Sequence, residues 1–260
     1  MLAHPKGVLG IAFGPSPREL ISGGEDGVIR TWEWEKARVL REMTPVAPRF
    51  ARSIALSPDG RTVAFGSISG IIGVYDLQAG KPIKSIKAHA LSVDCGVEFS
   101  RDGKMLVSVG HDEVRIWETS NWTQIATRVP KRKGFMALKP RFAPDSKSLA
   151  YALDGHTVSI IRIGEGWEEL HQIRLGGREF PECFAYSPSG RIFAVGTSVG
   201  TIKLWNSATT ERLGQVQLGQ AAIMSLVFSP DGKKIGAGLR DSTVVVADVT
   251  EFVDLVEKKR

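Results

Sequence analysis

Short apolar runs separated by polar turns follow one another along the whole chain. Ile11-Ala12-Phe13 is one such run, Thr62-Val63-Ala64-Phe65 is another, and Leu226-Val227-Phe228 is a third. Runs of this length that are bounded by Gly, Pro, Ser and Asp predict β-strands, whereas helices need longer stretches with apolar residues three or four positions apart. The pattern therefore predicts an all-β chain.

A turn signal recurs at a nearly constant interval between these strands. Its first residues are 43, 43, 43, 44 and 42 positions apart. Pro fixes φ, Asp bonds to its own backbone and Gly accepts positive φ, so the signal has the chemistry of a tight turn. Such regular spacing indicates an internal repeat. The six signals are Gly14-Pro15-Ser16-Pro17, Ser57-Pro58-Asp59-Gly60, Ser100-Arg101-Asp102-Gly103, Ala143-Pro144-Asp145-Ser146, Ser187-Pro188-Ser189-Gly190 and Ser229-Pro230-Asp231-Gly232.

Each repeat contains four predicted strands. One strand precedes the turn and a second follows it, and a third ends at positions such as Trp32-Glu33 or Trp205-Asn206. An outer strand with alternating polarity completes the unit, as in Leu213–Leu218. Four short strands in 40–45 residues match one blade of a β-propeller, in which neighbouring blades cover each other's apolar faces.

The repeats resemble those of the WD-repeat family, and the resemblance covers essentially the whole chain. It implies a set of hydrogen bonds among His, Ser or Thr, Asp and Trp that stabilises the blade and has no catalytic role. Two repeats keep the full set, as His4, Ser22, Asp26 and Trp32 and as His89, Ser108, Asp112 and Trp117. The other four repeats lack it, since Phe65, Tyr151 and Ala237 replace the Ser and Val199 replaces the Asp. The chain is therefore a divergent member.

We expect one propeller domain over residues 1–260 with six blades of four antiparallel strands and a basic tail at 257–260. The alternative is a seven-bladed ring whose missing blade lies outside this chain. The end of the chain fits two structures: Phe252, Leu255 and Val256 have helical spacing, while Val253 and Leu255 alternate as in a strand. Blade geometry favours the strand. The predicted repeats span about 7–48, 49–89, 90–133, 134–177, 178–220 and 221–256.

Composition and charge narrow the class of protein. Hydrophobic residues make up 42% and charged residues 24% of the chain, as in an ordinary globular protein. No apolar stretch approaches the ~20 residues of a membrane span, and the N-terminus lacks the apolar core of a secretory signal, so we expect a cytoplasmic protein. The net charge of +6 leaves open a nucleic-acid-associated module that uses a basic surface.

Motifs that could carry enzyme chemistry are weak. Gly196–Gly200 matches the hydrolase pattern G-x-S-x-G, but it falls between two predicted strands, where the motif needs a strand-to-helix turn. The five histidines show no i, i+4 pairing, and neither cysteine has a partner at metal-ligand spacing. We therefore expect no catalytic residue, no metal and no cofactor. A propeller enzyme, lactonase-like or part of a hydrolase-associated propeller, is the alternative, because Ser-Pro-Asp-Gly repeats also occur in those families.

The resemblance to this family implies a non-catalytic scaffold that binds a protein or peptide of unknown identity on one face of the propeller, alone or as part of a larger protein or complex. That face carries the loops that lead into each first strand and the turns between second and third strands. Many of its residues are large and apolar with Arg among them, as in interface hot spots. The alternative for several of them is packing between blades. The residues aligned to this face are Leu9, Phe50, Arg52, Ile68, Met136, Leu138, Phe180, Glu182, Met224 and Arg240.

Overall fold

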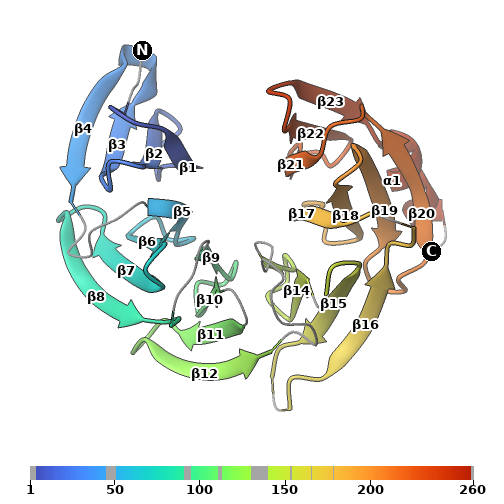
Figure 1. Ribbon diagram of the computed structural model, residues 1–260, viewed down its shortest axis with the longest axis horizontal. Helices are drawn as coiled ribbons and strands as arrows, with labels where there is room; N and C mark the ends of the chain where they lie inside the picture. The colour runs from blue at the N-terminus through green and yellow to red at the C-terminus, as the bar shows by residue number, and fades with distance from the viewer. Residues whose placement is uncertain are drawn as a thin grey trace. The chain divides into compact units, whose positions relative to one another are not determined.

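The computed structural model describes residues 4–44, 51–90, 95–110, 113–129, 140–152, 154–164, 166–177 and 179–258. The chain divides into two compact units, Met1–Pro140 (unit 1) and Arg141–Arg260 (unit 2). Each unit contains three antiparallel sheets, and each sheet corresponds to one predicted repeat (Figure 1). The predicted fold class, an all-β propeller with six blades in this chain, is confirmed.

Unit 1 holds blades 1 to 3, and the four strands of each blade follow one another in chain order. The first strands of the three blades, β1, β5 and β9, lie side by side. A 3-10 turn (Trp34–Lys36) joins β3 to β4. The strands are β1 (Val8–Phe13), β2 (Glu19–Gly24), β3 (Ile29–Glu33) and β4 (Arg38–Met43) in blade 1; β5 (Ala51–Leu56), β6 (Thr62–Ser67), β7 (Ile71–Asp76) and β8 (Lys81–Lys87) in blade 2; and β9 (Gly96–Phe99), β10 (Met105–Val109), β11 (Val114–Glu118) and β12 (Thr123–Arg128) in blade 3.

Unit 2 holds blades 4 to 6, and its last blade has three strands. The first strands of blades 5 and 6, β17 and β21, again lie side by side. The strands are β13 (Arg141–Phe142), β14 (Ser148–Ala152), β15 (Thr157–Arg162) and β16 (Glu169–Arg174) in blade 4; β17 (Pro181–Tyr186), β18 (Ile192–Thr197), β19 (Thr201–Asn206) and β20 (Arg212–Gln217) in blade 5; and β21 (Ile223–Phe228), β22 (Lys234–Leu239) and β23 (Val244–Asp248) in blade 6.

The recurring turn joins the first and second strands of a blade. In blade 2 the Ser57 hydroxyl accepts a hydrogen bond from the Thr62 amide at 2.9 Å, and the Asp59 carboxylate accepts one from the Arg61 amide at 3.0 Å. Gly60 has φ +72, which glycine adopts at little cost. Each residue type of the turn signal therefore satisfies a backbone group or permits the chain reversal.

Blades within a unit pack through apolar sheet faces. In unit 1, Phe65 and Tyr75 of blade 2 lie in one buried cluster with Ile21 and Ile29 of blade 1. A Cβ atom on Gly66 would clash with the carbonyl oxygen of Cys95, which leads into blade 3. Glycine at this position allows the second strand of one blade to approach the first strand of the next, because it has no side chain.

The C-terminal segment is the helix α1 (Thr250–Lys258), so the strand that we expected over Val253–Val256 is wrong. Phe252 and Val256 are four residues apart and both are buried. On a helix these two side chains share one face, which packs against β20 of blade 5, whereas a strand would place Asp254 between them on the buried face. The ring of Phe252 lies where Gly214 has no side chain.

Candidate functional site

Four side chains of blade 1 form a buried hydrogen-bond network. His4 Nε2 lies 2.7 Å from Ser22 Oγ, and the indole Nε1–H of Trp32 donates to the same oxygen at 2.7 Å. On the other side of the ring, His4 Nδ1 lies 2.9 Å from Asp26 Oδ1. The Ser22 hydroxyl therefore links the second strand to both the third strand and the segment before β1.

Arg30 extends this network to the outer strand of the blade. Its guanidinium donates to the carboxylates of Asp26 at 2.5 Å and Glu42 at 2.6 Å. Burial on its own would raise the pKa of Asp26, but hydrogen bonds from Arg30 and His4 lower that pKa to about 2. The carboxylate of Asp26 is therefore ionised over the physiological range and acts as an anchor within the blade.

Blade 3 has the equivalent arrangement around Ser108. The Nε2 atom of His89 lies 2.9 Å from Ser108 Oγ, and Trp117 Nε1–H donates to that oxygen at 2.9 Å. The predicted fourth member, Asp112, lies outside the described residues. The carboxylate of Glu113 lies 3.4 Å from His89 Nδ1.

Burial of His89 makes the stability of the protein depend on pH. Burial lowers the pKa of His89 to about 4; Glu113 opposes this change, and the charge of Arg115 adds to it. Because the unfolded chain has a His pKa near 6.5, it binds more protons than the folded protein between about pH 6.5 and 4. The stabilisation by neutral His89 is therefore complete above about pH 6.5 and is lost as the pH falls towards 4.

We expect the free energy of unfolding to fall between pH 7 and 4 by about 2–3 kcal/mol more in the wild type than in a His89→Gln variant. Urea unfolding at a series of pH values measures the difference between the two slopes. Identical slopes would show that His89 takes up its proton equally well in the folded and unfolded chains.

Blade 5 replaces the histidine network with an ion pair that sequence reasoning missed. Lys203 Nζ lies 2.5 Å from the Glu179 carboxylate and donates to the carbonyl oxygen of Leu175 at 3.0 Å. Lys203 stands two residues before Trp205, at the repeat position of Arg30 and Arg115. That recurrence of a basic residue was the available signal for an internal cation, but nothing in the sequence indicated Glu179 as its partner.

The G-x-S-x-G match lies in the turn between β18 and β19. A strand follows the turn directly, where the hydrolase motif needs a helix. The Ser198 hydroxyl accepts a hydrogen bond from the Phe180 amide at 3.1 Å, and the Ser198 amide donates to the Phe180 carbonyl at 2.9 Å. Ser198 thus fixes the loop that leads into β17.

Four residues aligned to the predicted binding face lie in blades 5 and 6 of unit 2. Phe180 immediately precedes β17 and Glu182 lies near its start, Met224 lies at the start of β21, and Arg240 is in the turn between β22 and β23. The Arg240 amide donates to the carbonyl of Ala222 at 2.9 Å, which joins the turn to the loop before β21. We call this set of four residues, Phe180, Glu182, Met224 and Arg240, the unit 2 face.

The apolar part of the unit 2 face is exposed but held in position. Phe180 is 37% and Met224 is 48% exposed. The ring of Phe180 stacks on His156 of the β14–β15 turn, with 4.7 Å between ring centroids and 28° between planes. His156 Nδ1 lies 2.9 Å from the carbonyl oxygen of Glu179. The aromatic side chain is therefore preorganised, which lowers the entropy cost of binding through it.

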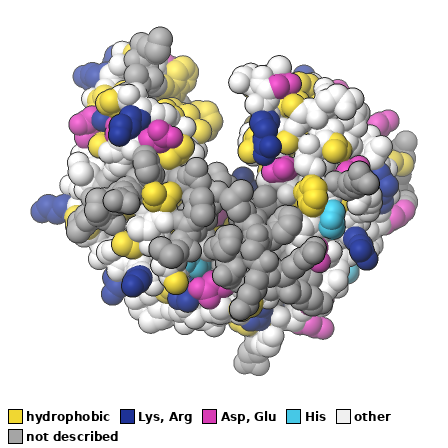
Figure 2. All heavy atoms as spheres, in the orientation of Figure 1, with side chains coloured by type: hydrophobic (Ala, Val, Ile, Leu, Met, Phe, Trp, Pro, Cys, Tyr) yellow, Lys and Arg dark blue, Asp and Glu magenta, His cyan; other side chains and the backbone are white. Residues whose placement is uncertain are grey.

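The charged part of the unit 2 face consists of Glu182 and Arg240. Burial raises the pKa of Glu182, and the charge of Arg240 partly offsets this. The guanidinium of Arg240 approaches the Glu182 carboxylate only to 3.9 Å and is largely exposed, so its donors can still bind another acceptor. Figure 2 shows hydrophobic, acidic and basic side chains close together on this part of unit 2.

The remaining residues of the predicted face lie in unit 1 or outside the described residues. Leu9 and Ile68 are half-buried residues of unit 1. The backbone of Arg52 lies in β5. Phe50, Met136 and Leu138 lie outside the described residues.

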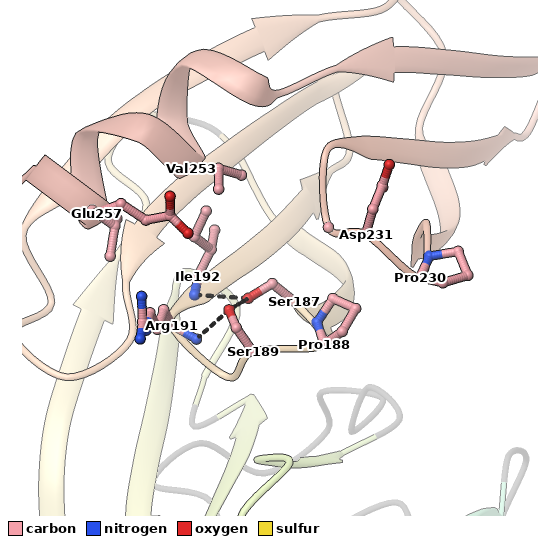
Figure 3. A pocket seen from close by; sticks show the side chains of 11 residues that line it. Ser187, Pro188, Ser189, Arg191, Ile192, Pro230, Asp231, Val253 and Glu257 are labelled. Atoms are coloured by element: carbon pink, nitrogen blue, oxygen red, sulfur yellow. Dashed lines mark hydrogen bonds between the residues drawn. The ribbon is translucent and has the colours of Figure 1, made fainter.

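A pocket in unit 2 was not predicted from the sequence. It lies between the turns of blades 5 and 6 and the helix α1, whose Val253 and Glu257 line one side (Figure 3). Ser187 Oγ accepts a hydrogen bond from the Ile192 amide at 3.0 Å, and Ser189 Oγ accepts one from the Arg191 amide at 3.4 Å. Both serine hydroxyls therefore bond within their own turn. The pocket is formed by the packing of α1 on the turns of blades 5 and 6.

Among the described residues, no cluster of three or more His, Cys, Asp or Glu side chains has the arrangement of a metal site. In the same part of the chain, no helix has the length and apolar character needed to span a membrane.

The fold and the two Ser-centred networks define a propeller built from repeats of the WD type. Residues 1–33, 80–118 and 213–248 match the family "WD domain, G-beta repeat", and residues 140–229 match the "Anaphase-promoting complex subunit 4 WD40 domain". The chain belongs to the WD-repeat family. Relatives of this kind suggest a protein-interaction scaffold in general.

Similar proteins include two from Arabidopsis thaliana. Protein ROOT INITIATION DEFECTIVE 3 is 27% identical over 88% of this chain and 55% of its own length. WD repeat-containing protein VIP3 is 25% identical over 88% of this chain and 62% of its own length. Protein hir1 of Schizosaccharomyces pombe is 25% identical over 98% of this chain and 31% of its own length. The chain therefore spans less than two thirds of the length of each of these relatives.

Proposed function

We propose that this chain is a non-catalytic interaction module that binds a protein or peptide through the unit 2 face. The observation that carries the proposal is the exposure of Phe180, Met224 and Arg240 in blades 5 and 6, on turns and strand ends held by backbone hydrogen bonds. Aromatic residues, Met and Arg are the residue types enriched in protein interfaces. The scaffold role of relatives in the WD-repeat family also supports this function.

The arrangement suits a segment with an apolar side chain and a nearby acidic group. The apolar side chain would pack on Phe180 and Met224, and the acidic group would accept hydrogen bonds from Arg240. Glu182, whose pKa is raised by burial, gains a competing negative charge in such a complex, which favours its protonated form. Binding should therefore strengthen as the pH falls through the raised pKa of Glu182.

Substitution of this face should remove bound partners without unfolding the protein. We expect Phe180→Ala combined with Arg240→Glu to weaken capture of proteins from a native lysate by at least ~100-fold, because hot-spot residues each contribute about 2 kcal/mol or more. Quantitative mass spectrometry of the captured proteins measures the loss, and circular dichroism checks the fold.

The matched control is Val39→Ala, which alters an exposed valine of the outer strand β4. Proteins that bind through the unit 2 face should be lost with the double variant and kept with the control. If the double variant and the control capture the same proteins to the same extent, the unit 2 face does not bind them.

A further inference from the structure

The last blade of unit 2 has one buried sheet face and one open sheet face. Leu226 and Phe228 lie on the buried face, which packs against blade 5. Val227, Val244 and Val246 lie on the open face and are 66%, 80% and 65% exposed. Within the described part of unit 2, nothing covers these three valines, which we call the valine row.

The valine row occupies repeat positions that are buried where a following blade is present. In blade 5 the positions of Val244 and Val246 are held by Ile202 and Leu204, and both are fully buried in the cluster that blades 5 and 6 share. The row is exposed because no described sheet of unit 2 packs on this face of blade 6, although equivalent side chains of blade 5 are buried. Exposed apolar rows of this kind mark interaction surfaces.

A glycine of blade 6 keeps room for a neighbouring first strand. Gly238 has the repeat position of Gly196, where an added Cβ would lie 2.8 Å from Cγ2 of Ile223 in the next blade. A Cβ atom added to Gly238 would have Oγ of Ser225, in the same blade, as its nearest neighbour at 2.8 Å. Blade 6 thus has the features of a surface that receives the first strand of another blade.

The first strand of unit 1 presents the matching side chains. Val8, Ile11 and Phe13 of β1 are 53%, 63% and 71% exposed, and we call them the β1 row. In blade 6 the repeat positions of Ile11 and Phe13 are Leu226 and Phe228, which are buried against blade 5. Within unit 1, the described residues leave the β1 row uncovered.

We propose that the valine row of one copy of this chain binds the β1 row of a second copy, so that the interface between successive blades continues from copy to copy. Neither row contains a charged side chain, so their contact removes apolar surface from water without desolvating an ion. The two surfaces differ from each other, and the interface is therefore head-to-tail, which permits assemblies larger than a dimer. This surface is separate from the unit 2 face and does not depend on the proposed function.

Two variants test the proposal because each blocks one surface only. Val244→Lys with Val246→Lys blocks the valine row, and Ile11→Lys with Phe13→Lys blocks the β1 row. Sedimentation velocity over a wide range of protein concentration should show that the wild type associates. Each variant alone should self-associate at least ~10-fold more weakly than the wild type. An equimolar mixture of the two variants should form a heterodimer, because one intact surface of each kind remains.

The control Val39→Lys, on the exposed outer strand β4, should associate like the wild type. Circular dichroism establishes that each variant is folded, and the same positions changed to Ser provide a milder pair if a lysine variant unfolds. A wild type that remains monomeric at every concentration, a mixture that forms no heterodimer, or a blocked variant that still associates like the wild type would each overturn the proposal.

Discussion

Replacement of Ser22 by Ala should lower the free energy of unfolding by about 2–4 kcal/mol. The Ser22 hydroxyl accepts the indole N–H of Trp32 and bonds to His4 Nε2, and all three side chains are buried. Without the hydroxyl, two buried polar groups lose their partner, and each such loss costs about 1–3 kcal/mol. Because alanine leaves the backbone of β2 unchanged, the loss reports on the network itself.

Urea unfolding followed by tryptophan fluorescence measures this effect, since Trp32 belongs to the network. The control is Ser16→Ala, because among the described residues the Ser16 hydroxyl accepts one exposed hydrogen bond, from the Arg18 amide. We expect this control to change the free energy of unfolding by less than about 0.5 kcal/mol. Equal effects of the two substitutions would mean that the buried network does not stabilise blade 1.

Replacement of Phe252 by Ala should lower the free energy of unfolding by about 3–5 kcal/mol. The Phe252 ring is buried against Gly214 of β20 and belongs to the cluster that blades 5 and 6 share. Its removal leaves a cavity between α1 and blade 5 that the neighbouring strands cannot fill without moving. Such an effect is expected only if the C-terminal helix is an integral part of the core of unit 2.

Leu255 provides the matched control, because it lies on the same helix and its side chain is 44% exposed. We expect Leu255→Ala to cost less than about 1 kcal/mol. Differential scanning calorimetry of both variants gives the comparison. An unfolding temperature of Phe252→Ala equal to that of the wild type would show that α1 does not pack on blade 5.

Much of the fold could be predicted from the sequence because each blade is specified locally. Turns such as Ser57–Thr62 contain the donors and acceptors that close them, and the alternation of the flanking strands sets which side chains are buried. The α1 segment could not be predicted in the same way, since Phe252–Val256 fits both helical and strand periodicity. A contact with Gly214, far away in the sequence, favours the helix.

The repeat register fixes where the residues of the candidate site lie in their blades, and their role in binding stays a prediction. The repeat spacing aligned Phe180, Met224 and Arg240 to one face, and in the structure they lie just before β17, in β21 and in the turn between β22 and β23. The stacking of His156 on Phe180 joins turns of two different blades, so local sequence does not indicate it. The pairing of Lys203 with Glu179 depends on tertiary structure for the same reason.

Site-specific photo-crosslinking tests the proposed binding surface most directly. A photoreactive phenylalanine analogue at position 224 should form covalent adducts with a binding protein in native lysate, and the Phe180→Ala, Arg240→Glu double variant should abolish these adducts. The same analogue at position 39, on the outer strand β4, should not form them. If position 39 yields the adducts of position 224, or if they persist in the double variant, the unit 2 face is not where this chain binds its partner.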